Sequence, residues 1–390
     1  MFHFKDKCEG FVRARKPCSV FYAPYICELQ ILIQIQKTEN MSPKFNVFCL
    51  KGTILLFFLQ FLQVSYAQYD FSSVDAALAN RSKLLGNNVV ALIFKDGKVV
   101  YKKEIGEDFT SKTQAPIASC SKWLTAAMVM TFVDEGKLRL DDKVSDYLPI
   151  FSTYGKKYIT IRHCLSHQTG VDAPGGIMGG ILERRKYETL EDEVNAFASK
   201  HEIETNPGQL FRYSNIGLDI AGRVCEVIAR KSFNQLMAER ILRPCGMKGT
   251  SFESEKAVSP SGGAISTAAD YMNFLAMLLN KGMYNGKQVL SEAAIAEMHT
   301  NQVPQTVKMF SPDVAKGFQY GLGAWIQTSD DKGIATVVSS PGLFGTWPYI
   351  DYCRGYACIF FVKNILGDGK RVMYMHLKES IDNIIGGTCR

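Results

Sequence analysis

Segments typical of β-strands lie near both ends of the chain, and mostly helical patterns fill the long stretch between them. Residues 88–106 predict a hairpin, because two runs rich in β-branched residues flank an Asp-Gly turn at 95–98. The region of about 140–310 combines helical periodicity with polar and glycine-rich loops. Strand-like runs then return at 320–326, 333–339 and 355–362, followed by a helix over 372–385. This order predicts one sheet assembled from about 85–115 and 318–390, with a helical insertion between its two parts.

Length and charge exclude some classes of protein. The chain has 390 residues, of which 46% are hydrophobic and 21% charged, as expected for one large folded domain or two interlocked ones. The net charge is +7, but residues 1–67 contribute +4 of it through eight basic and four acidic side chains. The remaining residues carry 37 basic and 34 acidic side chains, which are interspersed. Because a nucleic-acid binder usually shows a clustered basic face, we predict no nucleic-acid partner.

Residues 41–67 have the layout of a secretory signal peptide. Two lysines precede an apolar stretch over about 53–64, and small residues stand at the −3 and −1 positions before Gln68. The apolar stretch is short for a bilayer span. We therefore predict cleavage before Gln68 and a secreted or periplasmic mature chain of residues 68–390. An uncleaved membrane anchor, and with it a membrane-anchored scaffold, is the alternative.

Residues 1–40 stand before this signal and show no clear periodicity. A signal peptide begins a chain, so Met41 is the expected natural start. We interpret residues 1–40 as an extension of the gene model or as disordered. An extension that belongs to the protein and disables secretion is the alternative.

The cysteines do not form a recognisable metal or disulfide framework. Seven of the eleven lie after residue 67, and none of these forms a Cys-x-x-Cys pair. We expect most of them to be small buried hydrophobic residues. A disulfide between Cys353 and Cys358 is an option in a secreted chain.

Ser119-Cys120-Ser121-Lys122 is the first group of residues that could carry chemistry. Helical periodicity begins at about Ser119 and ends at Gly136, which places Ser119 at a helix N-terminus. Positions i and i+3 share a helix face, so the Lys122 amine can reach the Ser119 hydroxyl. A buried lysine has a lowered pKa and can accept a proton near neutral pH. Ser121 has no lysine three residues later and is therefore a weaker candidate for the nucleophile.

Tyr213-Ser214-Asn215 is the second group, at the predicted entry from a loop into a helix. A tyrosine near a lysine ammonium can be held as a phenolate and act as a general base. The Asn215 side chain can donate to a substrate amide or orient the lysine. A buried tyrosine followed by a helix cap would be the structural explanation for the same residues.

Other motifs argue against competing kinds of site. His163 and His167 have a spacing that can bind a metal, but the metalloprotease pattern fails and no third ligand suggests itself. No serine lies in a Gly-x-Ser-x-Gly elbow. The glycines of 175–180 lack the lysine of a phosphate-binding loop. We therefore predict neither a metal nor a cofactor.

The two groups, taken together, resemble the first two signatures of the β-lactamase-related serine hydrolases, in the branch of class C β-lactamases, penicillin-binding proteins and serine esterases. Further blocks similar to this family follow in the same order, at 135–149, 159–170, 206–215, 242–252 and 261–282. The resemblance implies an α/β (α+β) fold with an antiparallel sheet flanked by helices, beside a mainly helical domain. It also implies an active site in the groove between these two parts.

The resemblance implies a role for each matching residue. Ser119 would attack a carbonyl and form an acyl-enzyme, and its backbone N–H would form half of an oxyanion hole. Lys122 and Tyr213 would share the proton transfers of acylation and deacylation. Asn215 would support Lys122 and the substrate. Cys120, directly after the nucleophile, is expected to fill the core.

The third signature departs from the family pattern. The family usually has Lys-Thr-Gly or His-x-Gly on the strand that lines the site, whereas the best match here is Ser340-Pro341-Gly342. Gly342 would allow close approach of the backbone to a ligand, and the N–H of Leu343 would complete the oxyanion hole. The cation is replaced by Ser340, which favours neutral esters or amides over β-lactams and peptidoglycan stems. Arg354 or Lys363 are candidates for a substitute charge.

We therefore predict a serine hydrolase of the class C-like type that acts on a small ester, amide or peptide. Carboxylesterase, D-amino-acid peptidase and β-lactamase-like activities all fit this mechanism, and family likeness alone does not choose among them. A catalytically inactive relative that binds a ligand in the same groove is the alternative, motivated by the altered third signature.

Overall fold

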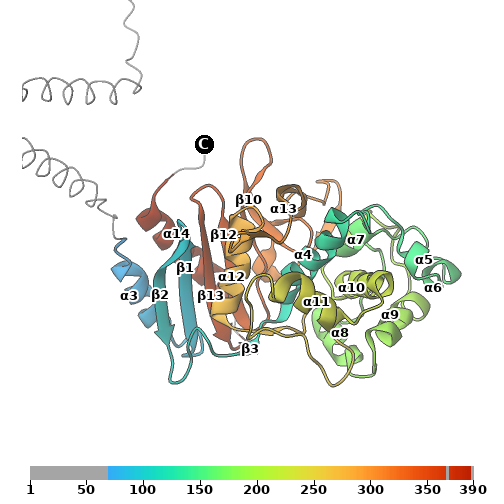
Figure 1. The fold of residues 1–390 in the computed structure, drawn as a ribbon, viewed down its shortest axis with the longest axis horizontal. Coiled ribbons are helices and arrows are strands. Elements are labelled where there is room, and N and C mark those ends of the chain that lie inside the picture. Colours follow the sequence, from blue (N-terminus) through green and yellow to red (C-terminus); the bar gives the residue numbers. More distant parts are fainter. Residues whose placement is uncertain (1–68, 366–368, 388–390) are drawn as a thin grey trace, which may run out of the picture. The chain divides into compact units, whose positions relative to one another are not determined.

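The computed structural model describes residues 69–365 and 369–387, and residues from Tyr69 onward form one compact unit (Figure 1). The predictions for residues 1–40 and for a signal peptide at 41–67 lie outside the described residues. None of the described helices is long and apolar enough to cross a membrane.

Seven antiparallel strands form the main sheet, in the order β2-β1-β13-β12-β11-β10-β9. They are β1 Val89–Lys95, β2 Lys98–Ile105, β9 Gln319–Tyr320, β10 Trp325–Ser329, β11 Ala335–Ser339, β12 Gly345–Asp351 and β13 Tyr356–Lys363. Strand β1 pairs with β13 from Val89↔Val362 to Lys95↔Tyr356, so the two ends of the chain meet in the middle of the sheet. The expectation of one antiparallel sheet built from both ends is confirmed.

The hairpin between β1 and β2 turns at Asp96 and Gly97, which both have positive φ (50° and 79°). A two-residue turn of this hand matches the twist of antiparallel strands, and Asp-Gly is one of the sequences that can adopt it. Strand β12, in contrast, was not predicted. All of its residues are buried, so it shows no alternation of polar and apolar side chains, and Pro348 lies inside it.

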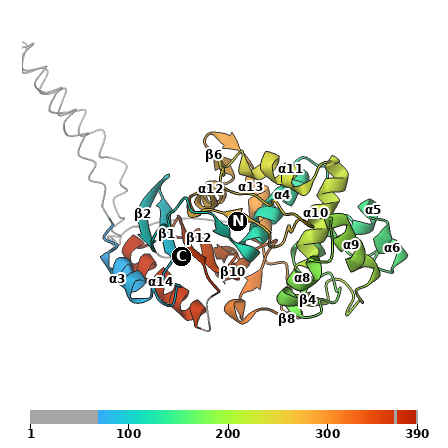
Figure 2. The same cartoon turned by 90° about the horizontal axis from the view of Figure 1, so that it is seen from below.

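Helices cover both faces of the sheet (Figures 1 and 2). Helices α3 (Ser72–Asn80) and α14 (Lys370–Ile385) pack together on one face, and α12 (Ala268–Leu279) covers the other. The two faces of β1 separate accordingly: Val90 and Leu92 belong to one core cluster, and Val89, Ala91 and Ile93 belong to the second. Side chains of successive strand residues point to opposite faces, so one strand contributes to two cores.

The middle of the chain forms the helical part. Its helices are α5 Val144–Tyr147, α6 Ile150–Thr153, α7 Ile161–Leu165, α8 Gly176–Arg184, α9 Leu190–Ser199, α10 Ile216–Ala229, α11 Phe233–Met237 with the π-helical η2 Ala238–Leu242, and α13 Glu292–Met298. Short strands between the helices form three separate two-stranded sheets: β3 Ala115–Pro116 with β5 Ile265–Ser266, β4 Leu210–Arg212 with β8 Lys308–Phe310, and β6 Met283–Tyr284 with β7 Lys287–Gln288. A 3₁₀ turn, η3 Asp313–Ala315, precedes β9.

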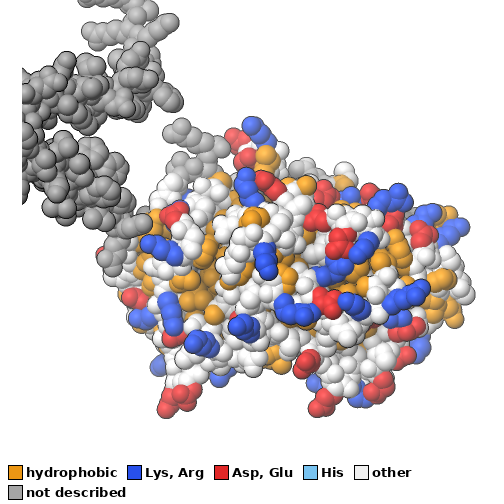
Figure 3. Space-filling view, in the orientation of Figure 1, with side chains coloured by type: hydrophobic (Ala, Val, Ile, Leu, Met, Phe, Trp, Pro, Cys, Tyr) orange, Lys and Arg blue, Asp and Glu red, His pale blue; other side chains and the backbone are white. Residues whose placement is uncertain are grey.

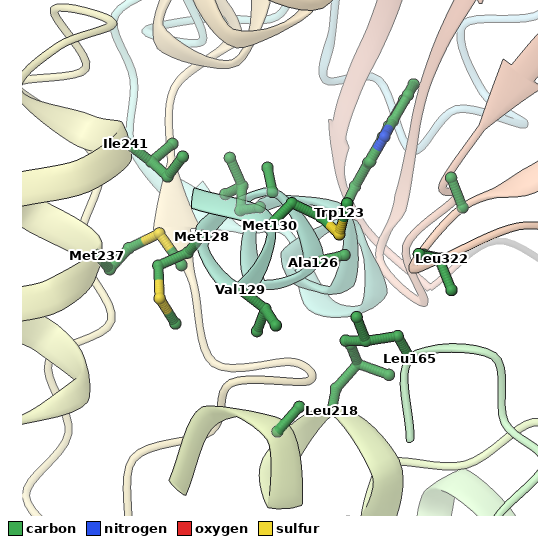
Figure 4. Close-up of a cluster of buried hydrophobic side chains, with 14 of the residues drawn as sticks. Trp123, Ala126, Met128, Val129, Met130, Leu165, Leu218, Met237, Ile241 and Leu322 are labelled. Carbon is green, nitrogen blue, oxygen red and sulfur yellow. The ribbon is translucent and has the colours of Figure 1, made fainter. Parts of the chain in front are cut away.

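Helix α4 (Ser121–Asp134) lies at the centre of the molecule, and every residue from its start to Phe132 is buried. Figure 4 shows side chains of α4 pointing in several directions, with residues of other elements around them: Leu165, Leu218, Met237, Ile241 and Leu322. A helix that is buried on all sides is a core helix. The N-terminus of α4 is therefore held rigidly, and the candidate nucleophile lies there.

The cysteines differ from one expectation. Five are buried free thiols, namely Cys120, Cys164, Cys225, Cys245 and Cys358, in line with their interpretation as small core residues. The option of a Cys353–Cys358 disulfide is wrong, because Cys358 is a free thiol inside the core cluster beneath β13. Cys353, in contrast, is disulfide-bonded.

Charges on the surface are mixed. On the face shown in Figure 3, both Lys or Arg and Asp or Glu side chains are present on the described surface. This is the interspersed pattern expected from the sequence after residue 67.

Candidate active site

Ser119 lies in a 3₁₀ turn, η1 (Ala118–Cys120), that leads directly into α4. The turn begins with Ala118 at φ = 45°, a left-handed conformation that costs an alanine energy. The turn is fixed from outside, since the Tyr271 hydroxyl donates to the Cys120 carbonyl at 2.8 Å. The Ser119 side chain is 7% exposed. This agrees with the expected position at a helix N-terminus: Ser119 lies in the turn two residues before the α-helix begins.

Lys122 is completely buried, and its ammonium has three acceptors. Its Nζ lies 3.2 Å from the Ser119 Oγ, 3.1 Å from the Asn215 Oδ1 and 2.9 Å from the Ser261 carbonyl oxygen. Burial lowers the pKa of Lys122 to about 7, against the charge of Asp219, which favours the protonated form. Close to neutral pH, a substantial fraction of Lys122 is therefore a neutral amine beside the Ser119 hydroxyl.

Tyr213 and Asn215 reach the site from the junction between β4 and α10. The Tyr213 N–H donates to the Phe310 carbonyl at 3.1 Å, which continues the parallel pairing of β4 with β8. Asn215 stands at the position before α10, where an asparagine commonly caps a helix. Its side chain makes no capping bond and instead accepts from Lys122. The local structure thus brings the Tyr213 side chain to Ser119 and the Asn215 side chain to Lys122.

The Tyr213 ring is surrounded by other rings. Its centroid lies 4.5 Å from that of His167 and 5.1 Å from that of Trp325, and the Lys122 Nζ lies 5.0 Å from the ring centroid. Burial raises the pKa of Tyr213, although a hydrogen bond with the Ser119 side chain opposes this. Burial therefore works against a phenolate held by the lysine in the free protein. The ammonium faces the ring, and burial disfavours the charged phenol.

Ser340, the first residue of the altered third signature, faces the protein backbone. Its hydroxyl lies 3.1 Å from the Ser119 carbonyl and 3.4 Å from the Gly323 carbonyl, and the residue is 1% exposed. A hydroxyl has one proton and donates to one of these acceptors at a time. Ser340 therefore links the turn that contains Ser119 (η1), which we call the nucleophile turn, to the loop that leads into β10.

Gly342 makes the close approach expected of it, but to the protein itself. A Cβ at this position would lie 2.3 Å from the Ile117 carbonyl oxygen and 3.2 Å from the Cys120 Sγ. The Gly342 N–H donates to the Thr346 carbonyl at 2.8 Å. This glycine therefore allows the segment after β11 to pack closely against the turn that contains Ser119.

Two backbone N–H groups next to this contact make no hydrogen bond within the described residues, those of Ser119 and Leu343. Ser119 is at the start of a helical turn, where N–H groups have no partner within the helix. The oxyanion hole that the family resemblance implied stays a prediction, and these two donors are the groups it requires.

Neither candidate for a substitute cation contacts the site residues. Arg354 pairs with Asp351 at 3.2 Å, and the Lys363 Nζ lies 5.1 Å from the Phe109 ring centroid. Ser121 is a structural residue: its Oγ accepts from the Ala264 N–H at 3.1 Å.

His167 is a residue of the site whose place there the sequence did not reveal. Its Nδ1 accepts from the Ser214 N–H at 3.4 Å, and its Nε2 lies 3.0 Å from the Tyr320 hydroxyl. Burial, with a contribution from the Lys122 charge, holds the pKa of His167 well below its usual range. It is a neutral ring that positions Tyr213. His163 instead caps α7, accepting from the Thr160 N–H at 3.2 Å.

Ser261 and Asp219 were missed as well. The sequence offered only a weak signal for Ser261, in the family-like block 261–282, and none for Asp219, which lies among apolar residues in the first turn of α10.

Comparison with known proteins identifies the class to which this fold and site belong. The sequence model of the β-lactamase family matches residues 78–367. The chain therefore belongs to the β-lactamase family, whose members are serine hydrolases, and the family expected from the sequence is confirmed.

Individual relatives agree with this assignment. The chain is 26% identical over 289 residues to the D-alanyl-D-alanine-carboxypeptidase/endopeptidase AmpH of Escherichia coli strain K12, which covers 66% of this chain and 74% of that protein. It is 28% identical to a candidate β-lactamase from Bacteroides dorei DSM 17855 in a crystal structure, with a TM-score of 0.71 over 81% of this chain and 99% of the other. EstCE1, a hydrolase with promiscuous acyltransferase activity, shares the fold at 20% identity and a TM-score of 0.66, over 79% of this chain and 97% of its own.

Proposed function

We propose that this protein is a serine hydrolase that cleaves small neutral esters or amides through an acyl-enzyme on Ser119. The observation that carries the proposal is the hydrogen bond between the Ser119 Oγ and the Nζ of a completely buried lysine. A buried amine with a pKa of about 7 can accept the proton of a hydroxyl that attacks a carbonyl.

The reaction proceeds in two halves. Neutral Lys122 takes the Ser119 proton as Oγ bonds to the substrate carbonyl carbon, and the carbonyl electrons move to its oxygen. When the carbonyl re-forms, the bond to the leaving alcohol or amine breaks, and that group receives the proton. Tyr213, protonated in the free protein, lies in the site and can pass this proton on. Water then attacks the ester on Ser119 with the same residues in the reverse order, which releases the acid.

Developing negative charge on the carbonyl oxygen needs donors that are already in place. The N–H groups of Ser119 and Leu343 have no other partner within the described residues. We propose that they form the oxyanion hole, where one such donor is usually worth about 3–4 kcal/mol of transition-state stabilisation.

The third signature supports a neutral substrate. A lysine or histidine there could hold a substrate carboxylate. Ser340, in contrast, is buried, and its hydroxyl donates to backbone carbonyls. A D-amino-acid peptide, whose leaving amine carries a carboxylate, would therefore find no cation at this position. An uncharged ester or amide loses nothing by this change.

A direct test uses the protein produced from the full chain in a secreting host, as wild type, Ser119→Ala and the remote control Ser145→Ala. Each is incubated with a fluorophosphonate probe, p-nitrophenyl butyrate and nitrocefin. We expect the wild type and Ser145→Ala to be labelled once, on the peptide that contains Ser119, and to turn over the butyrate ester faster than nitrocefin. Ser119→Ala should do neither. A folded wild type that is not labelled would contradict the proposal and favour the inactive ligand-binding alternative.

We propose further that residues 41–67 direct secretion. The charge and size pattern of that segment supports this, and so does the disulfide at Cys353, since disulfides persist in oxidising compartments. N-terminal sequencing of the secreted product tests it. A first residue of Gln68 is expected, whereas a product that retains residues 41–67 in the membrane fraction would contradict it.

A further inference from the structure

The third acceptor of Lys122 is a backbone carbonyl, and a buried carboxylate holds that carbonyl in place. Ser261 accepts from the Lys122 Nζ at 2.9 Å. The Ser261 N–H donates to the Asp219 Oδ1 at 2.9 Å, and its hydroxyl donates to the Asp219 Oδ2 at 3.1 Å. Asp219 thus binds both donors of the residue whose carbonyl binds the lysine.

Helix α4 holds the same loop from the other side. The Thr125 hydroxyl donates to the Pro260 carbonyl at 2.6 Å, one residue before Ser261. Ser121 accepts from the Ala264 N–H, three residues after Ser261. The loop is therefore fixed to α4, which carries Lys122, and to α10, which carries Asp219. Its position relative to the lysine is determined by both helices.

The carboxylate itself is fully buried and needs compensation. Arg184 supplies it: its Nη2 lies 2.5 Å from the Asp219 Oδ2 and 3.0 Å from the Glu193 Oε1. The Arg184 Nη1 also donates to the Val258 carbonyl at 3.2 Å, close to the same loop. Burying a charged group away from solvent costs free energy. The buried Asp219 carboxylate is hydrogen-bonded directly to Ser261, the residue whose carbonyl contacts Lys122.

We propose that Asp219 is a positioning residue for the catalytic base, which holds the Ser261 carbonyl against Lys122 and sets the electrostatic environment of the lysine. The role of Lys122 as the catalytic base rests on the proposed function. The contacts of Asp219 with Ser261, and of Ser261 with Lys122, do not depend on any substrate. Asp219 thus has a role in the site although it lies outside the three signatures.

Several charged or titratable groups change the pKa of Lys122, some raising it and others lowering it. After burial, the largest are Asp219 on α10, whose charge raises the pKa of Lys122, and Arg184 on α8, whose charge lowers it. Cys120 from the nucleophile turn raises it by a smaller amount. The remaining groups are Tyr213, which is protonated, His167, which is neutral, and Glu193 on α9, which shares Arg184 and whose pKa burial raises to about 8.

The signs give opposite predictions for two variants. Asp219→Asn removes a negative charge, so the neutral amine is favoured and the Lys122 pKa falls. Arg184→Gln removes a positive charge, so the Lys122 pKa rises. Since the neutral amine is the active form, the acid limb of the pH–rate profile should move to lower pH in Asp219→Asn and to higher pH in Arg184→Gln. A merely structural role would move neither limb in a defined direction.

The experiment measures the pH dependence of Ser119 labelling and, separately, the titration of Lys122 by NMR of protein with ¹³C-labelled lysine. We compare wild type, Asp219→Asn, Asp219→Ala and Arg184→Gln. Asp351→Asn is the matched control, since Asp351 is equally buried and pairs with Arg354 and Lys378, away from the site. We expect the Lys122 titration to fall by about half a pH unit or more in Asp219→Asn. The maximal labelling rate of Asp219→Ala should be at least about tenfold lower than that of Asp219→Asn, because alanine also loses the hydrogen bonds to Ser261.

The outcomes separate the two proposals. Lys122 titration and labelling that are unchanged in Asp219→Asn and Asp219→Ala, or changed equally by Asp351→Asn, would overturn the positioning role. If wild type is not labelled at all, the hydrolase proposal fails, while the Lys122 titration still decides whether Asp219 acts on the lysine. Thermal melting of each variant shows which of them are folded, and Asp219→Asn, the closest in shape, keeps the test open if Asp219→Ala does not fold.

Discussion

The two sides of the Ser119 turn use their side chains differently. On one side, polar groups of Lys122 and Tyr213 contact the Ser119 side chain, and Asn215 accepts a hydrogen bond from Lys122. On the other side, Ser340 and Gly342 contact the backbone of the turn and present no charge. Under the proposed function, the first side carries out the proton transfers, whereas the second packs against the turn. Variants on the first side should change rates, and variants on the second should change stability.

The largest effect is expected from Lys122→Met. Removing the base should slow Ser119 labelling by about 100- to 10,000-fold. The melting temperature should change little, because burial already disfavours the charged form of this amine and methionine has a similar length. Fluorophosphonate labelling and thermal melting check both effects. The control is Lys287→Met, an exposed lysine on β7. Labelling at the wild-type rate in Lys122→Met would mean that another group activates Ser119.

Only the arrangement on the Lys122 side of the Ser119 turn could be predicted from the sequence. Spacing alone predicted that the lysine at i+3 reaches Ser119, and the Asp96-Gly97 turn predicted the hairpin, because local geometry determines both. The orientation of Ser340 depends on contacts with Ser119 and Gly323, which are distant in sequence, so no local pattern could reveal it. The burial of the Tyr213 ring among other rings is equally non-local, so no local pattern could reveal that burial raises the pKa of its phenol.

The second largest effect is expected from Gly342→Ala. The added Cβ would stand 2.3 Å from the Ile117 carbonyl oxygen, so the two segments must separate. We expect a loss of about 1–3 kcal/mol in the free energy of unfolding, together with slower labelling as the turn shifts. Denaturant unfolding measures the loss. For comparison, a Cβ on Gly262 would meet its nearest atom at 3.6 Å, so Gly262→Ala should cost less stability. Equal stability of Gly342→Ala and wild type would show that the contact is loose.

The smallest effect is expected from Ser340→Ala. It removes one hydrogen bond to the nucleophile turn, worth about 1 kcal/mol of stability. Labelling should slow by only a few fold, because no proton passes through this hydroxyl. Chemical unfolding and labelling rates measured on the same preparation compare the two effects. A loss of labelling as large as that in Lys122→Met, with stability unchanged, would place Ser340 in the chemistry and break the comparison.

The most direct test of the central claim, that a buried neutral Lys122 activates Ser119, is the pH dependence of Ser119 acylation by the fluorophosphonate probe in the wild-type protein. Burial lowers the pKa of Lys122 to about 7, and only the neutral amine accepts the proton. The rate should therefore rise as the pH increases and reach half its maximum near pH 7. A rate that does not change between about pH 5.5 and 8.5, or that rises only near the ordinary lysine pKa of about 10.4, would contradict the account.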